Sequence, residues 1–300
     1  MIQEKYSYSS IACFKQCPYK YKLIYIDHNF IPCPSIATDF GTLIHHIEEQ
    51  IGKDLQEGLE PRYDDLIKEF DKNIEELCNK YPTEFYELDK SNRSYADKSE
   101  YYKREAIYRL QNRLKNNPNL KIVGLEKEFY LQFNEYVFHG FIDRIFYDSL
   151  NDTYMIEDIK TYSKLMEKKD LKVPLQHVIY SLALKGMFEN NINIRCTYDL
   201  PLCDSIQDVD QRYLQKGILE LQDMFEEIKY SDFEPKPTPL CHWCLFSGTY
   251  PNQPDEAKGL CPYFSLWTKN NKNMRCNYYW QGVKKHQKIL EQFKKDLDLK

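Results

Sequence analysis

The sequence predicts an α/β protein: helices come first, then an antiparallel meander of three strands, a helix, a further strand, a helix and a cysteine-bearing tail. Two features of the sequence predict this class. Residues 122–160 are rich in β-branched and aromatic side chains, and short polar turns at 134–135 and 148–152 divide them into strands. In most of the remaining chain, apolar residues recur at helical spacing.

The first hundred residues are predicted to be helical. A Ser-rich start opens a helix in residues 6–27, Pro18 interrupts it, and a second helix follows. Residues 39–51 form the next helix. Residues 54–113 are charged and Tyr-rich with helical periodicity, so we expect a helical insertion there, which ends at 116–119 (NNPN).

The second half of the chain is predicted to carry the sheet. The expected elements are strands at 122–133, 136–147, 153–160 and 193–200, and helices at 174–188 and 206–230. Pro235, Pro237 and Pro239 then deliver the chain to Cys241. We expect four parts: 1–53, 54–118, 119–232 and 233–300.

Composition and charge exclude several classes of protein. The 300 residues are 42% hydrophobic with 10 Gly, which excludes disordered and collagen-like chains. No apolar run approaches the roughly 18 residues that a membrane helix needs, so we expect no membrane contact and a location in the cytoplasm of a bacterial or phage-infected cell. The net charge is −5, yet residues 264–300 hold nine Lys/Arg and three acids. This basic tail fits contact with a polyanion, although a solvated terminal helix explains it equally well.

Three charged residues in the strand region are predicted to share one face. If the turn centres between residues 150 and 151, Asp143 lies opposite Asp158, and Lys160 follows on the same face about 6.6 Å further along. Arg144 and Glu157 then point to the other face, and we expect Glu157→Ala to be far milder than substitution of the two aspartates. Carboxylates suit Mg²⁺ or Mn²⁺, and a lysine can stabilise charge developing on phosphorus. A structural Asp–Lys pair at a sheet end is the alternative.

The order of several segments resembles the RecB-type branch of the PD-(D/E)XK nuclease superfamily, as found in CRISPR adaptation, AddB and phage exonucleases. The matching segments are Ser9-Ser10 leading to Cys17-Pro18 and Tyr21, Gly41-Thr-Leu-Ile-His45, Gly140-x-x-Asp143-Arg144, Asp158-Ile-Lys160-Thr161 and Gln176-x-x-x-Tyr180. The resemblance covers about residues 6–50 and 122–265. It implies a mixed central sheet flanked by helices, the restriction-endonuclease-like core, and divalent-metal hydrolysis of DNA phosphodiesters.

The resemblance also implies roles for the matching residues. Asp143 and Asp158 would be metal carboxylates, His45 a further metal ligand and Lys160 the catalytic lysine. His46 points elsewhere on the helix and is left out.

Two residues on a later helix and one on an earlier strand complete the expected site. Gln176 and Tyr180 are one helical turn apart and can reach the same place. The resemblance suggests that they contact DNA or the lysine, whereas simple helix packing is the alternative for Tyr180. Glu126, on the strand before Asp143, could hold an outer water.

Four cysteines near the two chain ends are predicted to form a cluster. The set is Cys17, Cys241, Cys244 and Cys261, with Cys13 as a substitute for Cys17. Four thiolates suit either Zn²⁺ or [4Fe–4S]. Cys-Pro pairs at two positions, together with the resemblance, favour iron–sulfur, while the long loop after Cys244 keeps structural Zn²⁺, with His242 as another possible ligand, open. The cluster would join the N-terminal helices to the tail.

We therefore expect a DNA exonuclease acting on single strands or duplex ends in replication, recombination or repair. A structure-specific endonuclease, a non-catalytic DNA-binding scaffold and a zinc-stabilised partner-binding protein are the alternatives. No GxxxxGK[ST] loop occurs, so a self-contained helicase–nuclease is excluded. A replication or recombination partner or a homo-oligomer remains open. The expected DNA contacts are Tyr19, Tyr21, Trp243 and the lysines of 164–172 and 284–295.

Overall fold

The computed structural model describes residues 5–32, 34–172, 174–188, 191–210, 212, 214–236, 241, 244–247, 254–257 and 260–261. The chain divides into two compact units, of which unit 1 is built from residues 1–33 and 222–300 and unit 2 from residues 34–221. Among the described residues, no helix has the length and apolar character needed to cross a membrane.

Unit 2 begins with four helices, as the sequence predicts. They are α3 (Ile36–Gln56), α4 (Tyr63–Lys80), α5 (Tyr95–Arg104) and α6 (Arg109–Asn116), with a short 3₁₀ turn η2 (Ala106–Tyr108) before the last. The first of these starts earlier and ends later than expected, and at its start the side chain of Ser35 caps it by accepting a hydrogen bond from Thr38 N at 3.2 Å. The predicted insertion is therefore helical, and it packs beside the long helix α3.

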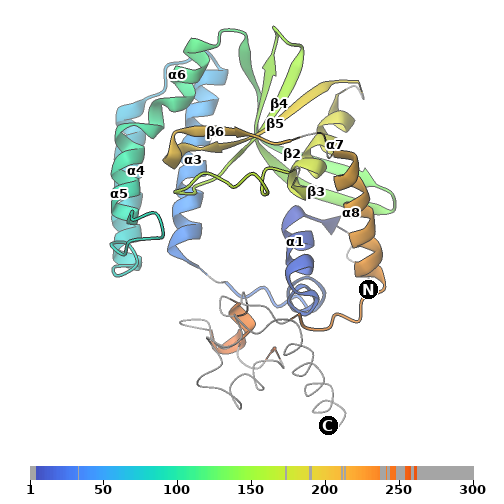
Figure 1. The fold of residues 1–300 in the computed structure, drawn as a ribbon. Coiled ribbons are helices and arrows are strands. Elements are labelled where there is room, and N and C mark those ends of the chain that lie inside the picture. The colour runs from blue at the N-terminus through green and yellow to red at the C-terminus, as the bar shows by residue number, and fades with distance from the viewer. Residues whose placement is uncertain are drawn as a thin grey trace. The chain divides into compact units, whose positions relative to one another are not determined.

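The sheet of unit 2 follows directly. Its strands are β2 (Leu120–Phe133), β3 (Tyr136–Asp148), β4 (Thr153–Ile159), β5 (Asn193–Leu200) and β6 (Ser205–Asp208). β2, β3 and β4 form the predicted antiparallel meander. Helix α7 (Leu175–Met187) is a crossover that returns the chain so that β5 pairs parallel to β4, and β6 pairs antiparallel to β5. The mixed sheet flanked by helices is thus confirmed (Figure 1).

The core of unit 2 fills the space between the sheet and the helices α3 to α6. Side chains from α3, such as Phe40, Ile44 and Ile51, meet Phe146 of β3 and Met155 of β4 in one buried apolar cluster. In Figure 1, α3 and α6 lie to one side of the sheet and α7 to the other. Polar side chains of the inner strands therefore lie in places from which water is largely excluded.

One predicted element is wrong. Residues 206–230 were expected to form a single helix, but the segment starts as strand β6 and becomes helix α8 (Leu214–Lys229) only later. Asp204 adopts a left-handed backbone conformation (φ +47°), which turns the chain back so that Ser205–Asp208 pairs with β5. The apolar periodicity of the sequence does not indicate the turn at Asp204.

Unit 1 contains the N-terminal helices. β1 (Lys5–Tyr6) precedes α1 (Tyr8–Gln16), α2 (Pro18–Tyr21) and a π-helical turn η1 (Lys22–Ile26). Ser7 and Ser10 form a reciprocal capping box at the start of α1, which accounts for the Ser-rich start. The division between the units falls within α8, and in unit 1 the ring of Phe225 meets that of Tyr6 edge-on at 5.0 Å.

Candidate metal centre of unit 2

The hairpin β3–β4 has the register that the sequence predicts. Arg144 pairs with Glu157, which aligns the preceding Asp143 with Asp158. Because side chains alternate across a strand, Asp143 and Asp158 share one face, and Arg144 and Glu157 share the other.

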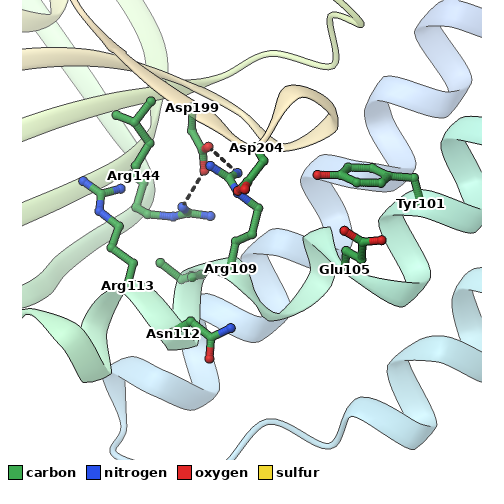
Figure 2. Close-up of a pocket in the computed structure, with 10 residues that line it drawn as sticks. Tyr101, Glu105, Arg109, Asn112, Arg113, Arg144, Asp199 and Asp204 are labelled. Carbon is green, nitrogen blue, oxygen red and sulfur yellow. Dashed lines mark hydrogen bonds and ion pairs between the residues drawn. The ribbon is translucent and has the colours of Figure 1, made fainter.

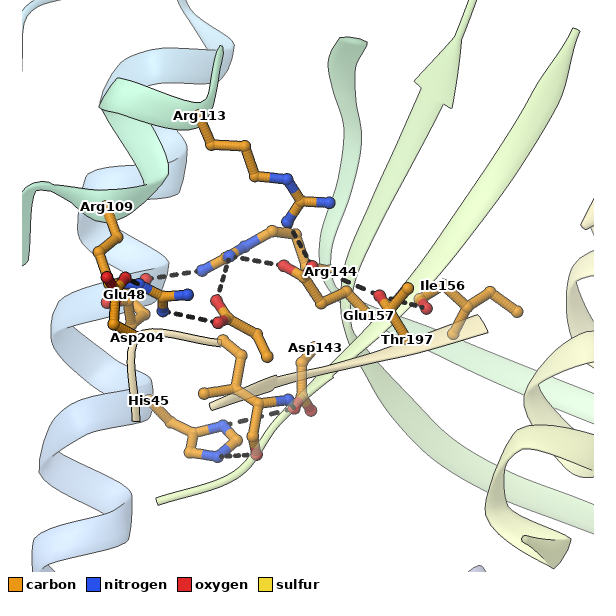
Figure 3. Close-up of polar contacts among 12 residues, drawn as sticks. His45, Glu48, Arg109, Arg113, Asp143, Arg144, Ile156, Glu157, Thr197 and Asp204 are labelled. Atoms are coloured by element: carbon orange, nitrogen blue, oxygen red, sulfur yellow. Dashed lines mark hydrogen bonds and ion pairs between the residues drawn. The ribbon is translucent and has the colours of Figure 1, made fainter. Parts of the chain in front are cut away.

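Helix α3 brings His45 to the same place. His45 Nδ1 lies 3.7 Å from Asp143 Oδ2 and 4.0 Å from Glu126 Oε1. One ligand atom from each of these three residues lies within 4.8 Å of the others. With its proton on Nε2, the imidazole donates to Ile159 O at 3.0 Å, which leaves Nδ1 as a lone-pair donor toward the carboxylates (Figure 3). A backbone carbonyl on the second nitrogen is the usual way in which a metal-binding histidine is oriented.

Glu126 is more prominent than the sequence analysis expected. The register of β2 with β3 pairs Leu125 with Arg144 and Lys127 with Ile142, so Glu126 stands opposite Asp143. Its backbone has φ +39°, a left-handed conformation that a non-glycine residue rarely adopts within a strand. The sequence is sufficient to predict this pairing, because Glu126 and Asp143 are equally far from the two-residue turn at 134–135 and therefore face each other in the hairpin.

Asp158 is held from two sides. Its Oδ2 lies 2.6 Å from Lys160 Nζ, and its Oδ1 accepts a hydrogen bond from Gln176 Nε2 at 2.8 Å. The same Gln176 amide donates to Tyr180 OH at 2.9 Å. Gln176 and Tyr180 lie one turn apart on α7, so the predicted convergence of this helix on the carboxylates is present in the structure.

Gly140 permits this arrangement. A Cβ at Gly140 would lie 3.1 Å from two ring atoms of Phe129, which lies across the strand at this point. The ring of Phe129 in turn meets Tyr180 edge-on at 5.8 Å. The glycine therefore leaves room for the aromatic contact that supports Tyr180 beside the carboxylates.

The electrostatics of the centre favour a bound cation. Burial, and next the charge of Asp158, raise the pKa of Asp143 to about 7. Burial lowers the pKa of His45, but Glu126 and the two aspartates outweigh it, and the net pKa is raised. Burial likewise opposes the charge of Lys160, but Asp158 raises its pKa overall, so the ammonium stays protonated. Crowded carboxylates with one imidazole are a donor set that fits Mg²⁺ or Mn²⁺.

The opposite face carries a buried charge that the sequence analysis did not expect. Glu157 points away from Asp158, as predicted, and the milder effect of Glu157→Ala on cleavage stays a prediction, but the position bears on stability. Its side chain is fully buried and forms ion pairs with Arg144 (2.8 Å) and Arg113. Removing it would leave Arg113 without its ion-pair partner and Arg144 with only Glu48 and Asp199. Breaking a buried ion pair in this way typically costs about 3–5 kcal/mol.

The four predicted cluster cysteines all belong to unit 1. Cys17 Sγ accepts a hydrogen bond from Lys236 N at 3.5 Å, and Cys244 N donates to Cys241 O at 3.1 Å, which closes a tight turn at the CxxC. Cys244 and Cys261 pack at the edge of a small apolar cluster. Tyr19 packs against the same apolar cluster, and its OH donates to the carbonyl of Leu260, the residue before Cys261, at 3.3 Å. His242 and Pro262 lie outside the described residues.

The residues predicted to contact DNA differ in how exposed they are. Tyr21 is only 1% exposed and packs against Phe14, Tyr25 and Phe233, so the expectation that it stacks on a base is wrong. Tyr19 is half-buried and donates to Leu260 O at 3.3 Å. The described lysines of 164–172 are exposed. Trp243, the lysines of 284–295 and the basic tail lie outside the described residues.

The fold and this centre together define an α/β protein of the restriction-endonuclease type. The sequence matches the family model of the PD-(D/E)XK nuclease superfamily over residues 5–249, and the chain belongs to that superfamily. A crystal structure of a putative exonuclease from Eubacterium rectale is similar, with a TM-score of 0.40, 12% sequence identity, and coverage of 81% of this chain and 86% of that chain. No curated protein matches the sequence.

Proposed function

We propose that the protein is a divalent-metal-dependent DNA nuclease of the RecB type that hydrolyses phosphodiester bonds, acting as an exonuclease on single strands or DNA ends. The observation that carries the proposal is the convergence of His45, Glu126 and Asp143 beside the Asp158–Lys160 pair. A purely structural Asp–Lys pair would need neither the histidine nor the additional carboxylates.

In this proposal, His45, Asp143 and Asp158 hold Mg²⁺ or Mn²⁺, with Glu126 holding an outer water. The bound ion would supply an activated water and neutralise charge on the phosphate. Lys160 keeps its proton and stabilises the negative charge that develops on phosphorus. Gln176 fixes the orientation of the Asp158 carboxylate.

Single-stranded DNA is favoured as substrate by two surface features of unit 2. Phe141 and Tyr130 are 47% and 58% exposed on the hairpin β2–β3. Phe141 is two residues from Asp143 on the same strand and hence on the same face, where a base of the bound strand could stack. The exposed lysines of 164–172 could hold phosphates. The intact set of Asp143, Asp158 and Lys160 argues against a non-catalytic scaffold.

The decisive experiment uses end-labelled linear DNA and a closed circular single strand, each with Mg²⁺, Mn²⁺ or EDTA. We expect metal-dependent shortening of linear single strands from an end, and no cleavage of the circle. Asp158→Asn should be inactive, and the matched exposed variant Asp170→Asn should be active. Cleavage of the circle would favour the endonuclease, and no cleavage of any substrate with either metal would contradict the proposal.

We further propose that Cys17, Cys241, Cys244 and Cys261 bind a [4Fe–4S] cluster in unit 1. The packing of Tyr19, two residues after Cys17, against the same small apolar cluster as Cys244 and Cys261 supports this set. Because thiolate ligation couples metal binding to folding, loss of the cluster should unfold this region without any redox role.

Protein purified without oxygen should be brown, and Cys17→Ala or Cys261→Ala should remove the visible absorbance. Cys78→Ala, a half-buried cysteine of unit 2, is the matched control and should leave the colour unchanged. A colourless preparation with stoichiometric zinc and no iron would overturn the iron–sulfur assignment in favour of structural Zn²⁺.

A further inference from the structure

A buried network of ion pairs lies on the face of the sheet opposite Asp143 and Asp158, and we call it the arginine network. Its members are Glu48, Arg109, Arg113, Arg144, Glu157 and Asp199. Arg144 is the hub: it is 1% exposed, and its guanidinium lies 2.8 Å from Glu48, 2.8 Å from Glu157 and 3.5 Å from Asp199 (Figure 3).

The outer arginines complete the network. Arg113 pairs with Glu157, and Arg109 Nη1 lies 2.7 Å from Asp199 Oδ1. Three arginines thus balance three carboxylates, and Glu48 also accepts a hydrogen bond from Tyr102 OH at 3.0 Å. A cavity of about 340 Å³ opens beside Arg109, Arg113 and Arg144 (Figure 2), but their charges are paired within the chain, so we do not interpret it as a ligand site.

Three members of the arginine network are close neighbours of proposed metal ligands. Two of them are adjacent to a ligand in the sequence, and one lies a helical turn away from a ligand. Glu48 is one turn from His45 on α3 and so lies on the same side of that helix. Arg144 directly follows Asp143. Glu157 directly precedes Asp158.

A fourth member reaches the lysine through the backbone. The carbonyl oxygen of Asp199 on β5 accepts a hydrogen bond from Lys160 N at 2.8 Å. The network therefore connects α3, β3, β4 and β5, the elements that carry or contact the groups of the metal centre, and it does so directly behind that centre.

We propose that the arginine network is a positioning device that sets the spacing of His45, Asp143 and Asp158, an inference that rests on the proposed function. Apolar packing between α3 and the sheet would tolerate small shifts, because the hydrophobic effect is not directional. A guanidinium with carboxylates at 2.8 Å on two sides permits much less movement, since charge-assisted hydrogen bonds depend on geometry. Replacing a buried ion network by apolar or neutral groups is often neutral or stabilising. Stability alone therefore does not require these charges.

The test separates positioning from stability. The triple variant Glu48→Gln/Arg144→Met/Glu157→Gln removes the hub and the two carboxylates at 2.8 Å from it. Asp199 keeps Arg109 at 2.7 Å, while Arg113, whose side chain is 16% exposed at the cavity, loses its partner Glu157. The single variant Glu48→Gln is nearly isosteric and keeps the contact with Tyr102. Asp204→Asn is the matched control, because Asp204 pairs with Arg109 at 2.7 Å but is 73% exposed and adjoins none of the proposed ligands.

Four quantities are measured for each folded protein. They are the thermal midpoint and, below it, the Mn²⁺ dissociation constant by calorimetry and kcat and KM for single-stranded DNA. In the triple variant we expect Mn²⁺ binding about tenfold or more weaker, a lower kcat and an unchanged KM. The thermal midpoint should fall only moderately, because Arg113 is the one network member that loses its partner. Glu48→Gln should weaken Mn²⁺ binding in the same direction, and Asp204→Asn should match the wild type.

Wild-type Mn²⁺ affinity in the triple variant would overturn the inference. If the triple variant does not fold, Glu48→Gln decides, and wild-type Mn²⁺ affinity in that folded variant would overturn the inference equally. If the wild-type protein itself neither binds Mn²⁺ nor cleaves DNA, the proposed function fails instead. The two failures are therefore distinguishable.

Discussion

Asp143→Asn should stabilise the metal-free protein while it destroys the proposed metal centre. The pKa of Asp143 is raised from 3.8 to about 7, first by burial and then by Asp158. A raised carboxyl pKa means that the fold favours the protonated form. The contribution of the protonated Asp143 carboxyl to the free energy of unfolding is fully present below about pH 4 and is lost progressively as the pH rises through about 7.

The size of the change in the free energy of unfolding follows from the pKa shift of Asp143. At about 1.4 kcal/mol per pKa unit, the ionised Asp143 lowers the free energy of unfolding by roughly 4 kcal/mol at pH 8, as an upper bound. Asparagine cannot ionise, and its side-chain oxygen can still accept the hydrogen bond that Ile159 N donates at 2.8 Å. We expect a gain on the order of 2–4 kcal/mol at pH 8, which raises the thermal midpoint by several degrees.

The pH dependence of this gain is the sharpest part of the prediction. Between pH 8 and pH 5 the gain should shrink by about 2–3 kcal/mol, because the wild-type carboxyl becomes protonated in the folded state. The assay is thermal or urea unfolding in EDTA at both pH values, with Glu69→Gln, an exposed partner of His46, as the control. The reasoning would be refuted if Asp143→Asn lowered the midpoint at pH 8, or raised it equally at both pH values. Saturating Mn²⁺ should stabilise the wild type and not the variant.

Further predictions concern cleavage, metal affinity and DNA binding. Asp143→Ala, Asp158→Ala and Lys160→Ala should each abolish cleavage of labelled DNA while binding, measured by fluorescence anisotropy, survives; a variant that still cleaves would exclude that residue from the mechanism. The Mn²⁺ affinity of the wild type should rise at least tenfold per pH unit below pH 7 and level off once both groups are deprotonated, because the cation competes with the proton on Asp143 and with that on His45, whose pKa is also raised; a flat calorimetric profile would contradict this. Affinity for single-stranded DNA should fall steeply with salt despite the net charge of −5, since phosphate contacts release counterions. Removing residues 283–300 should weaken that binding without abolishing cleavage, and an affinity independent of salt would contradict the electrostatic argument.

Much of the candidate centre could be predicted because hairpin geometry is local. A turn of known position sets which residues face each other, and this placed Asp143 opposite Asp158 and both on the face away from Arg144 and Glu157. The same reasoning applied to the preceding hairpin would have given Glu126 its place opposite Asp143. The helix that begins after Pro174 presents Gln176 and Tyr180 one turn apart for an equally local reason.

Local patterns in the chain were enough to predict most strands and helices and the shared face of the two aspartates, because alternation and helical periodicity are properties of short segments. The contact of His45 with Asp143 is different, because it depends on how α3 packs against the sheet. Long-range packing also made residues 205–208 a strand, because they pair with β5, whereas the helical pattern expected from residue 206 onward is realised only in residues 214–229. Glu157, on the face away from the site, is buried between two arginines for the same reason: burial and ion pairing at that position arise only where α3 and α6 meet the sheet.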